Sequence, residues 1–121
     1  MTRIDERTPM TRIAGLVAVG ATLALAGTAP AATQVNTLIG TDGPGFTITM
    51  SKKTVPAGTY VITIRDRSAI HNFHLTGPGV DKRTSLGKVY TTTWKVTLKK
   101  GTYKFVCDPH AAIMKGTLKV T

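Results

Sequence analysis

The sequence predicts an all-β domain, either an antiparallel sandwich or a small barrel. Apolar residues alternate with polar ones along several short stretches, and this period of two is typical of half-buried strands. Gly, Pro and Asp residues that favour turns separate the stretches. No convincing helical period is present after residue 31. About six or seven short strands joined by turns indicate one of these two architectures.

Each expected strand rests on this alternation. A strand is expected over residues 70–75, where His71, Phe73 and Leu75 share one face. Residues 80–89 could form a loop, an edge strand or a helical turn. The other alternating stretches lie at 46–50, 60–65, 93–99, 103–107 and 118–121. The turn-forming segments lie at 42–45, 56–58, 77–79 and 99–101.

Residues 1–31 have the pattern of a secretory signal peptide. Three arginines precede an apolar run at 13–26, and small residues at 29–31 suit a signal peptidase. We therefore expect cleavage after Ala31, which leaves one domain of residues 32–121. The apolar run is shorter than the roughly 20 residues that span a bilayer, so no transmembrane anchor is expected in the mature chain. A buried N-terminal helix is the alternative.

The chain is strongly basic. It contains 16 Lys+Arg against 6 Asp+Glu in 121 residues, a formal net charge of +10. Residues 1–31 hold three arginines and two acidic residues, so their removal leaves +9. Such a charge suits acidic partners or an anionic cell-envelope surface. A nucleic-acid partner is not expected, because only 6% of the residues are aromatic and most of these are needed for the core.

The single cysteine excludes an internal disulfide framework and a thiolate-rich zinc or iron–sulfur site. Cys107 nevertheless stands close in the sequence to His110 and Met114, at the end of an expected strand. His71 lies in a second expected strand upstream. Two imidazoles, a thiolate and a weak thioether form the ligand set of a blue-copper site, so the sequence predicts one mononuclear copper.

These motifs resemble those of the cupredoxins, the small blue-copper proteins of the plastocyanin, pseudoazurin and amicyanin group. The resemblance covers the whole of residues 32–121. It implies a Greek-key β-sandwich of about six to eight strands with copper near one end. The motifs that carry the resemblance are His71-Asn72, Cys107-x-Pro109-His110 and Met114-x-Gly116.

The resemblance also implies a role for each residue of the site. His71, Cys107 and His110 match the strong copper ligands of the family, and Met114 matches the axial thioether. Asn72 matches a residue that holds the ligand loop by hydrogen bonds and tunes the sulfur. One type 1 copper is therefore the expected cofactor.

By the same resemblance, the protein is expected to shuttle single electrons between redox partners as a monomer, in the periplasm or in an extracellular or cell-wall location. Its charge favours partners with acidic docking surfaces. The alternative is a copper-binding protein for storage, delivery or resistance. No enzyme activity is expected, because Cys107 and His110 lie too close on one turn for a thiol hydrolase. Docking and electron exit are expected at His110, Pro109, Ala111, Ala112 and Ile113.

Two neighbouring residues have simpler interpretations. His74 lies on the face of its expected strand opposite His71, so we expect a surface or hydrogen-bonding role rather than metal ligation. Met50 continues an apolar face and is expected in the core. The glycine-rich turns at 43–45 and 77–79 are expected to border the same end of the domain as His110.

Overall fold

The computed structural model describes residues 14–31 and 34–121. The chain divides into two compact units, Met1–Ala31 and Ala32–Thr121. Residues 14–31 contain no helix or strand, and all the buried residues described lie in the second unit. The arginines of the expected signal peptide lie outside the described residues. Cleavage after Ala31 remains a prediction. Within the described ranges, no helix has the length and hydropathy that a membrane crossing requires.

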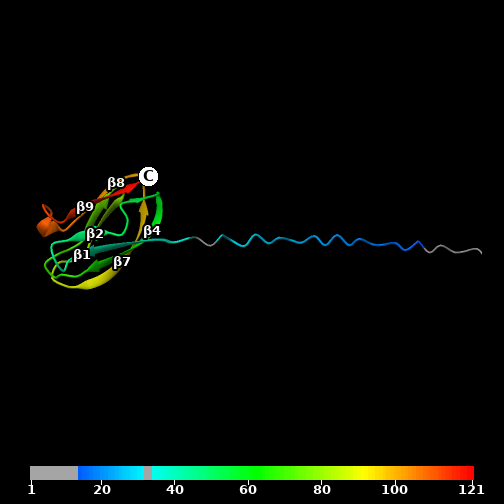
Figure 1. The fold of residues 1–121 in the computed structure, drawn as a ribbon, viewed down its shortest axis with the longest axis horizontal. Helices are drawn as coiled ribbons and strands as arrows, with labels where there is room; N and C mark the ends of the chain where they lie inside the picture. The colour runs from blue at the N-terminus through cyan, green and yellow to red at the C-terminus, as the bar shows by residue number, and fades with distance from the viewer. Residues whose placement is uncertain (1–13, 32–33) are drawn as a thin grey trace, which may run out of the picture. The chain divides into compact units, whose positions relative to one another are not determined.

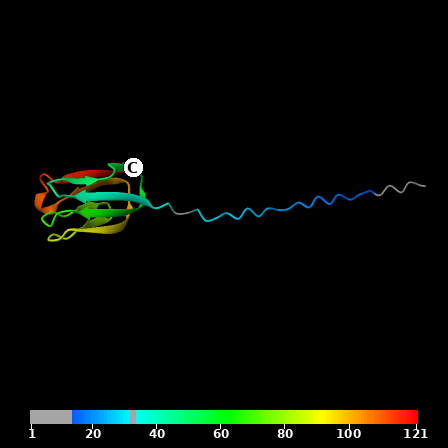
Figure 2. The same ribbon diagram turned by 60° about the horizontal axis from the view of Figure 1, so that its bottom comes forward.

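The second unit is a sandwich of two sheets (Figures 1 and 2). In the four-stranded sheet the order is β2 (Ile48–Met50), β1 (Asn36–Asp42), β4 (Gly58–Asp66) and β7 (Tyr90–Leu98). In the five-stranded sheet the order is β3 (Thr54–Val55), β9 (Lys115–Val120), β8 (Gly101–Val106), β5 (His74–Gly77) and β6 (Val80–Arg83). A short 3-10 helix, η1 (Asp108–His110), lies between β8 and β9.

The all-β sandwich is confirmed, with two differences from the expectation. Nine strands are described, because β1 and two short edge strands, β3 and β6, add to those expected. The sheets are also mixed rather than purely antiparallel, since β1 pairs in parallel with β4 and β3 pairs in parallel with β9. Parallel neighbours require a connection that crosses over, and the chain makes it by passing from one sheet to the other.

Alternating side chains of the facing strands fill the space between the sheets. Met50, as expected, is buried. The ring of Phe105 on β8 stacks on Phe73 with centroids 5.6 Å apart. Gly116 on β9 pairs with Phe105, and a Cβ at this position would collide with the phenylalanine ring. The glycine of the Met114-x-Gly116 motif is therefore required by core packing.

Three expectations about the strands and turns are wrong. Residues 70–73 form a loop, and only the end of the expected strand continues as β5. His71, Asn72 and Phe73 are all buried, which an alternating strand on a sheet surface does not allow. Phe46 lies in the turn before β2 and is 56% exposed. The turn at 77–79 lies at the opposite end from His110, beside Lys99.

Two acidic residues are buried where β1 and β4 end. Asp42 pairs in register with Asp66, and their exposed fractions are 0% and 1%. Asp66 accepts hydrogen bonds from the Thr84 hydroxyl and the Ser68 amide, whereas neither carboxyl oxygen of Asp42 has a partner among the described residues. Burial, and then the neighbouring Asp66, raise the pKa of Asp42 to about 7. Asp42 therefore keeps its proton in mild acid.

This pair predicts a pH-dependent stability. Between pH 3.8 and about 7 the folded Asp42 keeps a proton that the unfolded chain releases, so stability should fall as pH rises through this window. Asp42→Asn removes an ionisable group that is buried beside Asp66 and should stabilise the domain at pH 8 by about 1–3 kcal/mol. Urea unfolding at pH 4 and pH 8 measures both effects.

The matched variant is Asp66→Asn, which places an amide where two hydrogen bonds are accepted. It should destabilise the domain at both pH values. Equal effects of the two substitutions would contradict the asymmetry of the pair.

Candidate metal centre

Three potential metal ligands meet at one end of the sandwich. The Nδ1 atoms of His71 and His110 lie 3.1 Å apart. The Cys107 Sγ atom lies 3.7 Å from Nδ1 of His71 and 3.5 Å from Nδ1 of His110. Within the described residues, this is the group of three or more His, Cys, Asp or Glu side chains whose ligand atoms converge. The structure thus brings together residues 36 positions apart in the sequence.

The triangle of these atoms has the size that a metal ion requires. A point equidistant from the two nitrogens and the sulfur lies about 2 Å from each, close to the usual nitrogen–metal bond length. Two imidazoles and a thiolate in a trigonal set suit a copper ion that alternates between two oxidation states. The chain's own atoms therefore fit one type 1 copper.

The loop after β8 is closed by its own backbone. The Cys107 amide donates to the Met114 carbonyl at 3.0 Å, and the Met114 amide donates to the His110 carbonyl at 2.8 Å. Pro109 occupies the first turn of η1, where a missing amide hydrogen costs little. Met114 is fully buried, and its backbone fixes the end of the loop. These bonds hold Cys107 and His110 in place without a metal.

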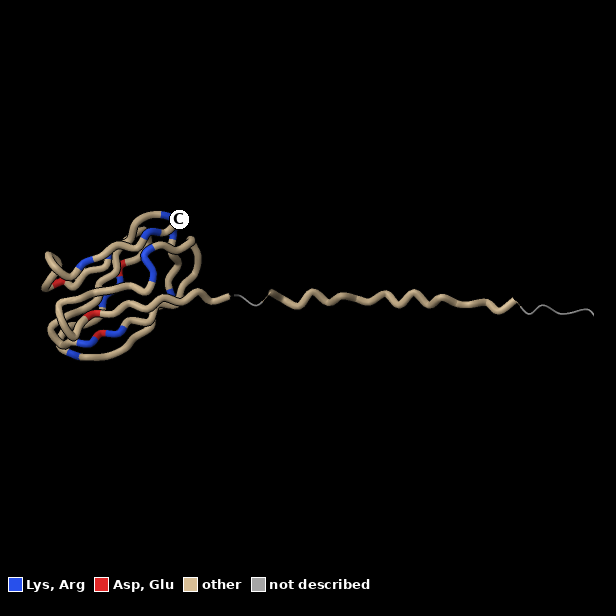
Figure 3. The backbone as a smooth tube through the Cα atoms, in the orientation of Figure 1, with Lys and Arg blue, Asp and Glu red and all other residues tan. Residues whose placement is uncertain are grey.

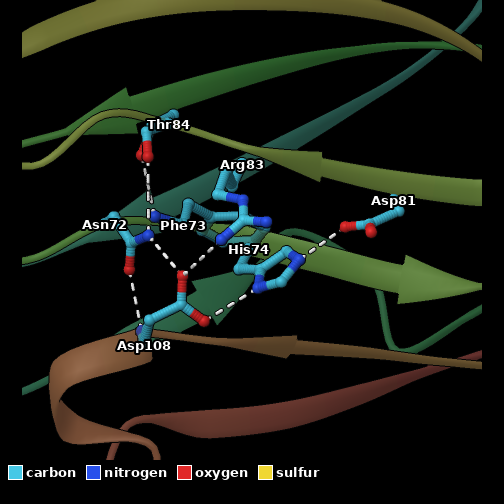
Figure 4. Close-up of polar contacts among 7 residues, drawn as sticks. All are labelled: Asn72, Phe73, His74, Asp81, Arg83, Thr84 and Asp108. Carbon is cyan, nitrogen blue, oxygen red and sulfur yellow. Dashed lines mark hydrogen bonds and ion pairs between the residues drawn. The ribbon is translucent and has the colours of Figure 1, made fainter.

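Asn72 joins the two segments that supply the ligands (Figure 4). Its side chain donates a hydrogen bond to the Asp108 carboxylate at 2.8 Å and accepts one from the Asp108 amide at 2.8 Å. The Asn72 amide group also lies 3.4 Å from the Thr84 carbonyl oxygen. Because Asn72 is 2% exposed, these polar groups have little access to water. Asn72 therefore links the His71 segment to the ligand loop by two hydrogen bonds.

His74 lies outside the triangle and contacts two carboxylates, as Figure 4 shows. Its Nδ1 atom is 2.8 Å from Asp108, and its Nε2 atom is 2.6 Å from Asp81. Burial opposes the charged imidazole, but hydrogen bonds with Asp108 and Asp81 outweigh it and raise the pKa of His74. Burial likewise opposes ionisation of Asp108, yet bonds from Asn72 and His74 lower its pKa. The hydrogen-bonding interpretation of His74 agrees with these contacts.

The surroundings of His110 are exposed and largely apolar. His110 is partly exposed, whereas His71 and Cys107 are fully buried. Phe46 packs edge-on against both imidazoles, with ring centroids 5.2 Å from His71 and 5.0 Å from His110. Pro109, Ala111, Ala112 and Ile113 of the ligand loop are exposed, and so is Asp108.

Sequence reasoning missed Phe46, Asp108 and Thr84 at this site. Phe46 looked like the first residue of a strand, although the glycines and proline before it favour an exposed turn. Asp108 lies between Cys107 and His110 in the sequence, and its role in the loop could have been predicted from that position. Thr84 carries no motif, and only the fold places its hydroxyl against the Phe73 amide at 2.8 Å.

Residues 35–121 match the family described as copper binding proteins, plastocyanin/azurin family. The chain therefore belongs to this family, the cupredoxins, and copper is its cofactor. Comparison with curated protein sequences gave no match.

Solved cupredoxin structures share the fold. A dithionite-reduced auracyanin from Roseiflexus castenholzii is 24% identical, with a TM-score of 0.53, and the match covers 73% of this chain and 98% of that one. Reduced rusticyanin is 23% identical with a TM-score of 0.55, over 70% of this chain and 78% of that one. Auracyanin A of Chloroflexus aurantiacus, a blue copper protein, is 20% identical with a TM-score of 0.51, over 73% and 100% of the two chains.

The Asn72 contacts predict a large effect on the metal-free protein. Asn72→Ala removes both hydrogen bonds to Asp108 and should lower the free energy of unfolding by about 2–4 kcal/mol. Urea unfolding without metal measures the loss. Thr93→Ala, on the exposed face of β7, serves as the control and should change stability by no more than about 0.5 kcal/mol. A loss no larger than that of the control would contradict this role of Asn72.

The His74 contacts predict a loss of stability on the alkaline side. Because the pKa of His74 is raised in the folded protein, the charged imidazole stabilises the fold at pH values below the ordinary pKa of 6.5. This contribution disappears as pH rises through the folded pKa. Unfolding measured from pH 6 to pH 9 should show the decline in the metal-free protein. In the Asp42→Asn background, which removes the decline that Asp42 causes up to about pH 7, His74→Gln should abolish the decline that remains. A decline that persists in the variant would assign the effect to another group.

Proposed function

We propose that the protein is an exported type 1 copper protein that carries single electrons between redox partners. The observation that carries this proposal is the convergence of the His71, His110 and Cys107 atoms within 3.7 Å of one another. In this proposal these three residues are the strong ligands and Met114 supplies the weak axial contact. Copper, when bound, accepts and releases one electron by alternating between Cu(II) and Cu(I).

The chain supports this role by holding its ligands still. Backbone hydrogen bonds close the ligand loop, and the two bonds between Asn72 and Asp108 tie that loop to the segment of His71. A site that is fixed before metal binding rearranges little between two oxidation states. Burial of Cys107 and His71 keeps water from the sulfur and from one imidazole. The ligands therefore need no slow rearrangement when the site gains or loses an electron.

Electrons are proposed to leave and enter through His110. It is the partly exposed ligand of the three, and the apolar side chains of Ala111, Ala112 and Ile113 follow it at the surface. Phe46 extends this apolar surface on the other side of the imidazole. A flat apolar contact here would bring a partner's redox group close to His110 without a specific charge pattern.

Electron transfer is favoured over copper storage or delivery by the burial of the ligands. Handover of Cu(I) to an acceptor requires that ligands be exchanged one at a time, yet His71 and Cys107 are 0% exposed. Export is part of the proposal, with residues 1–31 as a cleaved signal peptide, periplasmic or extracellular placement, and no enzyme activity of the chain itself.

The ligand assignment predicts a colour change. Residues 32–121 mixed with Cu(II) should develop the intense visible band of thiolate-to-copper charge transfer. Cys107→Ser and His71→Gln should lose that band. His74→Gln is the matched control and should keep it, because His74 points to carboxylates instead of the triangle. A colourless wild-type product, or a band retained by Cys107→Ser, would end the proposal.

The docking surface predicts a specific rate effect. Ala112→Asp places a charge beside His110 and should slow electron self-exchange at least tenfold while the visible band remains. Thr93→Asp makes the same change in charge on the exposed face of β7 and should leave the rate within about twofold. Stopped-flow or NMR line broadening measures the exchange. Equal rates in the two variants would contradict docking at His110.

A further inference from the structure

The end of the sandwich opposite the metal centre gathers lysines. We name this set the lysine pole. All of its members are exposed. They lie in the turn between β2 and β3, in the turn between β7 and β8, and near the end of β9. The lysine pole consists of Lys52, Lys53, Lys99, Lys100 and Lys119.

Strand pairing brings these segments together. The Lys119 amide donates to the Lys53 carbonyl at 2.9 Å, which joins β9 to the turn before β3. Gly58, the first residue of β4, pairs with Leu98, so Lys99 and Lys100 follow at the same end. β9 begins at Lys115, directly after the ligand loop, and reaches this end at Val120, and its six residues span about 20 Å. The lysine pole and the metal centre are therefore separated by the length of the sandwich.

No acidic residue belongs to the segments that form the lysine pole. The four acidic residues of 34–121 lie elsewhere, and Figure 3 marks only Lys and Arg on the turns beside the C-terminus. Asp42 and Asp66 are buried at the far ends of β1 and β4. Among the described residues, the ion pairs of Asp81 and Asp108 involve His74 and Arg83 instead. The five positive charges at the pole are therefore not neutralised there.

The residue types at the pole distinguish between kinds of partner. Arginine is favoured at protein–protein interfaces and lysine is depleted there. The arginines of this domain, Arg65, Arg67 and Arg83, lie toward the metal end of β4 and β6. The tyrosines near the lysine pole, Tyr60 and Tyr103, are buried. Flexible lysines without an exposed aromatic anchor suit a diffuse layer of negative charge better than a shaped protein surface.

We propose that the lysine pole docks on the surface of an anionic phospholipid bilayer and directs the metal centre away from it. The chain also enters the domain at this end, because Gln34 and Val35 line the same hollow as Lys52 and Pro56. Binding is electrostatic and reversible by salt, since each lysine near an anionic membrane strengthens binding about fivefold and the field decays within a Debye length. His110 then remains open to a soluble partner.

The test measures co-sedimentation of metal-free residues 32–121, the unit that contains the complete core, with vesicles. One vesicle population is phosphatidylcholine, and the other contains roughly 30% phosphatidylglycerol. Lys53→Gln/Lys99→Gln/Lys100→Gln should weaken binding to the anionic vesicles at least tenfold. Lys82→Gln/Lys88→Gln/Lys115→Gln removes the same charge from exposed positions outside the pole and should weaken it less than threefold.

A lipid-borne spin label gives the orientation. NMR signals of residues 51–53 and 99–101 should broaden, and those of residues 111–113 should not. The proposal would be overturned by strong binding to phosphatidylcholine alone, by equal losses in both triple variants, or by broadening at residues 111–113. So would salt-sensitive binding to soluble polyphosphate without binding to anionic vesicles. Because metal is absent throughout, these outcomes are independent of the copper assay.

Discussion

The arrangement of the metal centre depends on the pair of hydrogen bonds between Asn72 and Asp108. One segment of the site comes from a loop before β5, and the other follows β8, so no local structure joins them. The side chain of Asn72 satisfies both the carboxylate and the amide of Asp108 in a place that water hardly reaches. A buried amide left without these partners would cost more than the bonds themselves contribute, so the contact specifies one alignment of the segments.

The same strands separate the charges of the domain. Asp42 and Asp66 at the ends of β1 and β4, Asp108 in η1 and the three arginines lie toward the metal centre, whereas lysine is the charged residue of the opposite turns at 51–53 and 99–101. A net charge of +10 for the whole sequence conceals this polarity. Where the charge lies matters more than its total, because screening limits its reach to about 10 Å. In this account an apolar surface serves electron exchange and the lysine pole serves attachment.

The sequence was a better guide to the proposed ligands than to the backbone conformation around them. Cys107, His110 and Met114 lie in one short segment, and His71 is followed by Asn72, so chemistry and order identified them before any fold was known. Alternation could not show that residues 70–73 leave the sheet, because a strand and a buried loop both need apolar side chains.

Asp42 and Phe46 were harder still to interpret from the sequence. A buried acid is visible only when its partner on another strand is known, and an aromatic residue in a turn has no period to mark it. Strand β1 also escaped prediction, since Gly40 and Asp42 occupy two of its inward positions. Tertiary contacts decide such positions, and these contacts join residues far apart in the chain.

The most direct test of the central claim is X-ray absorption at the copper edge on the loaded protein. One sulfur and two imidazole nitrogens should surround the copper in both oxidation states, with little change in distance. A first shell of nitrogen and oxygen alone, without sulfur, would contradict it.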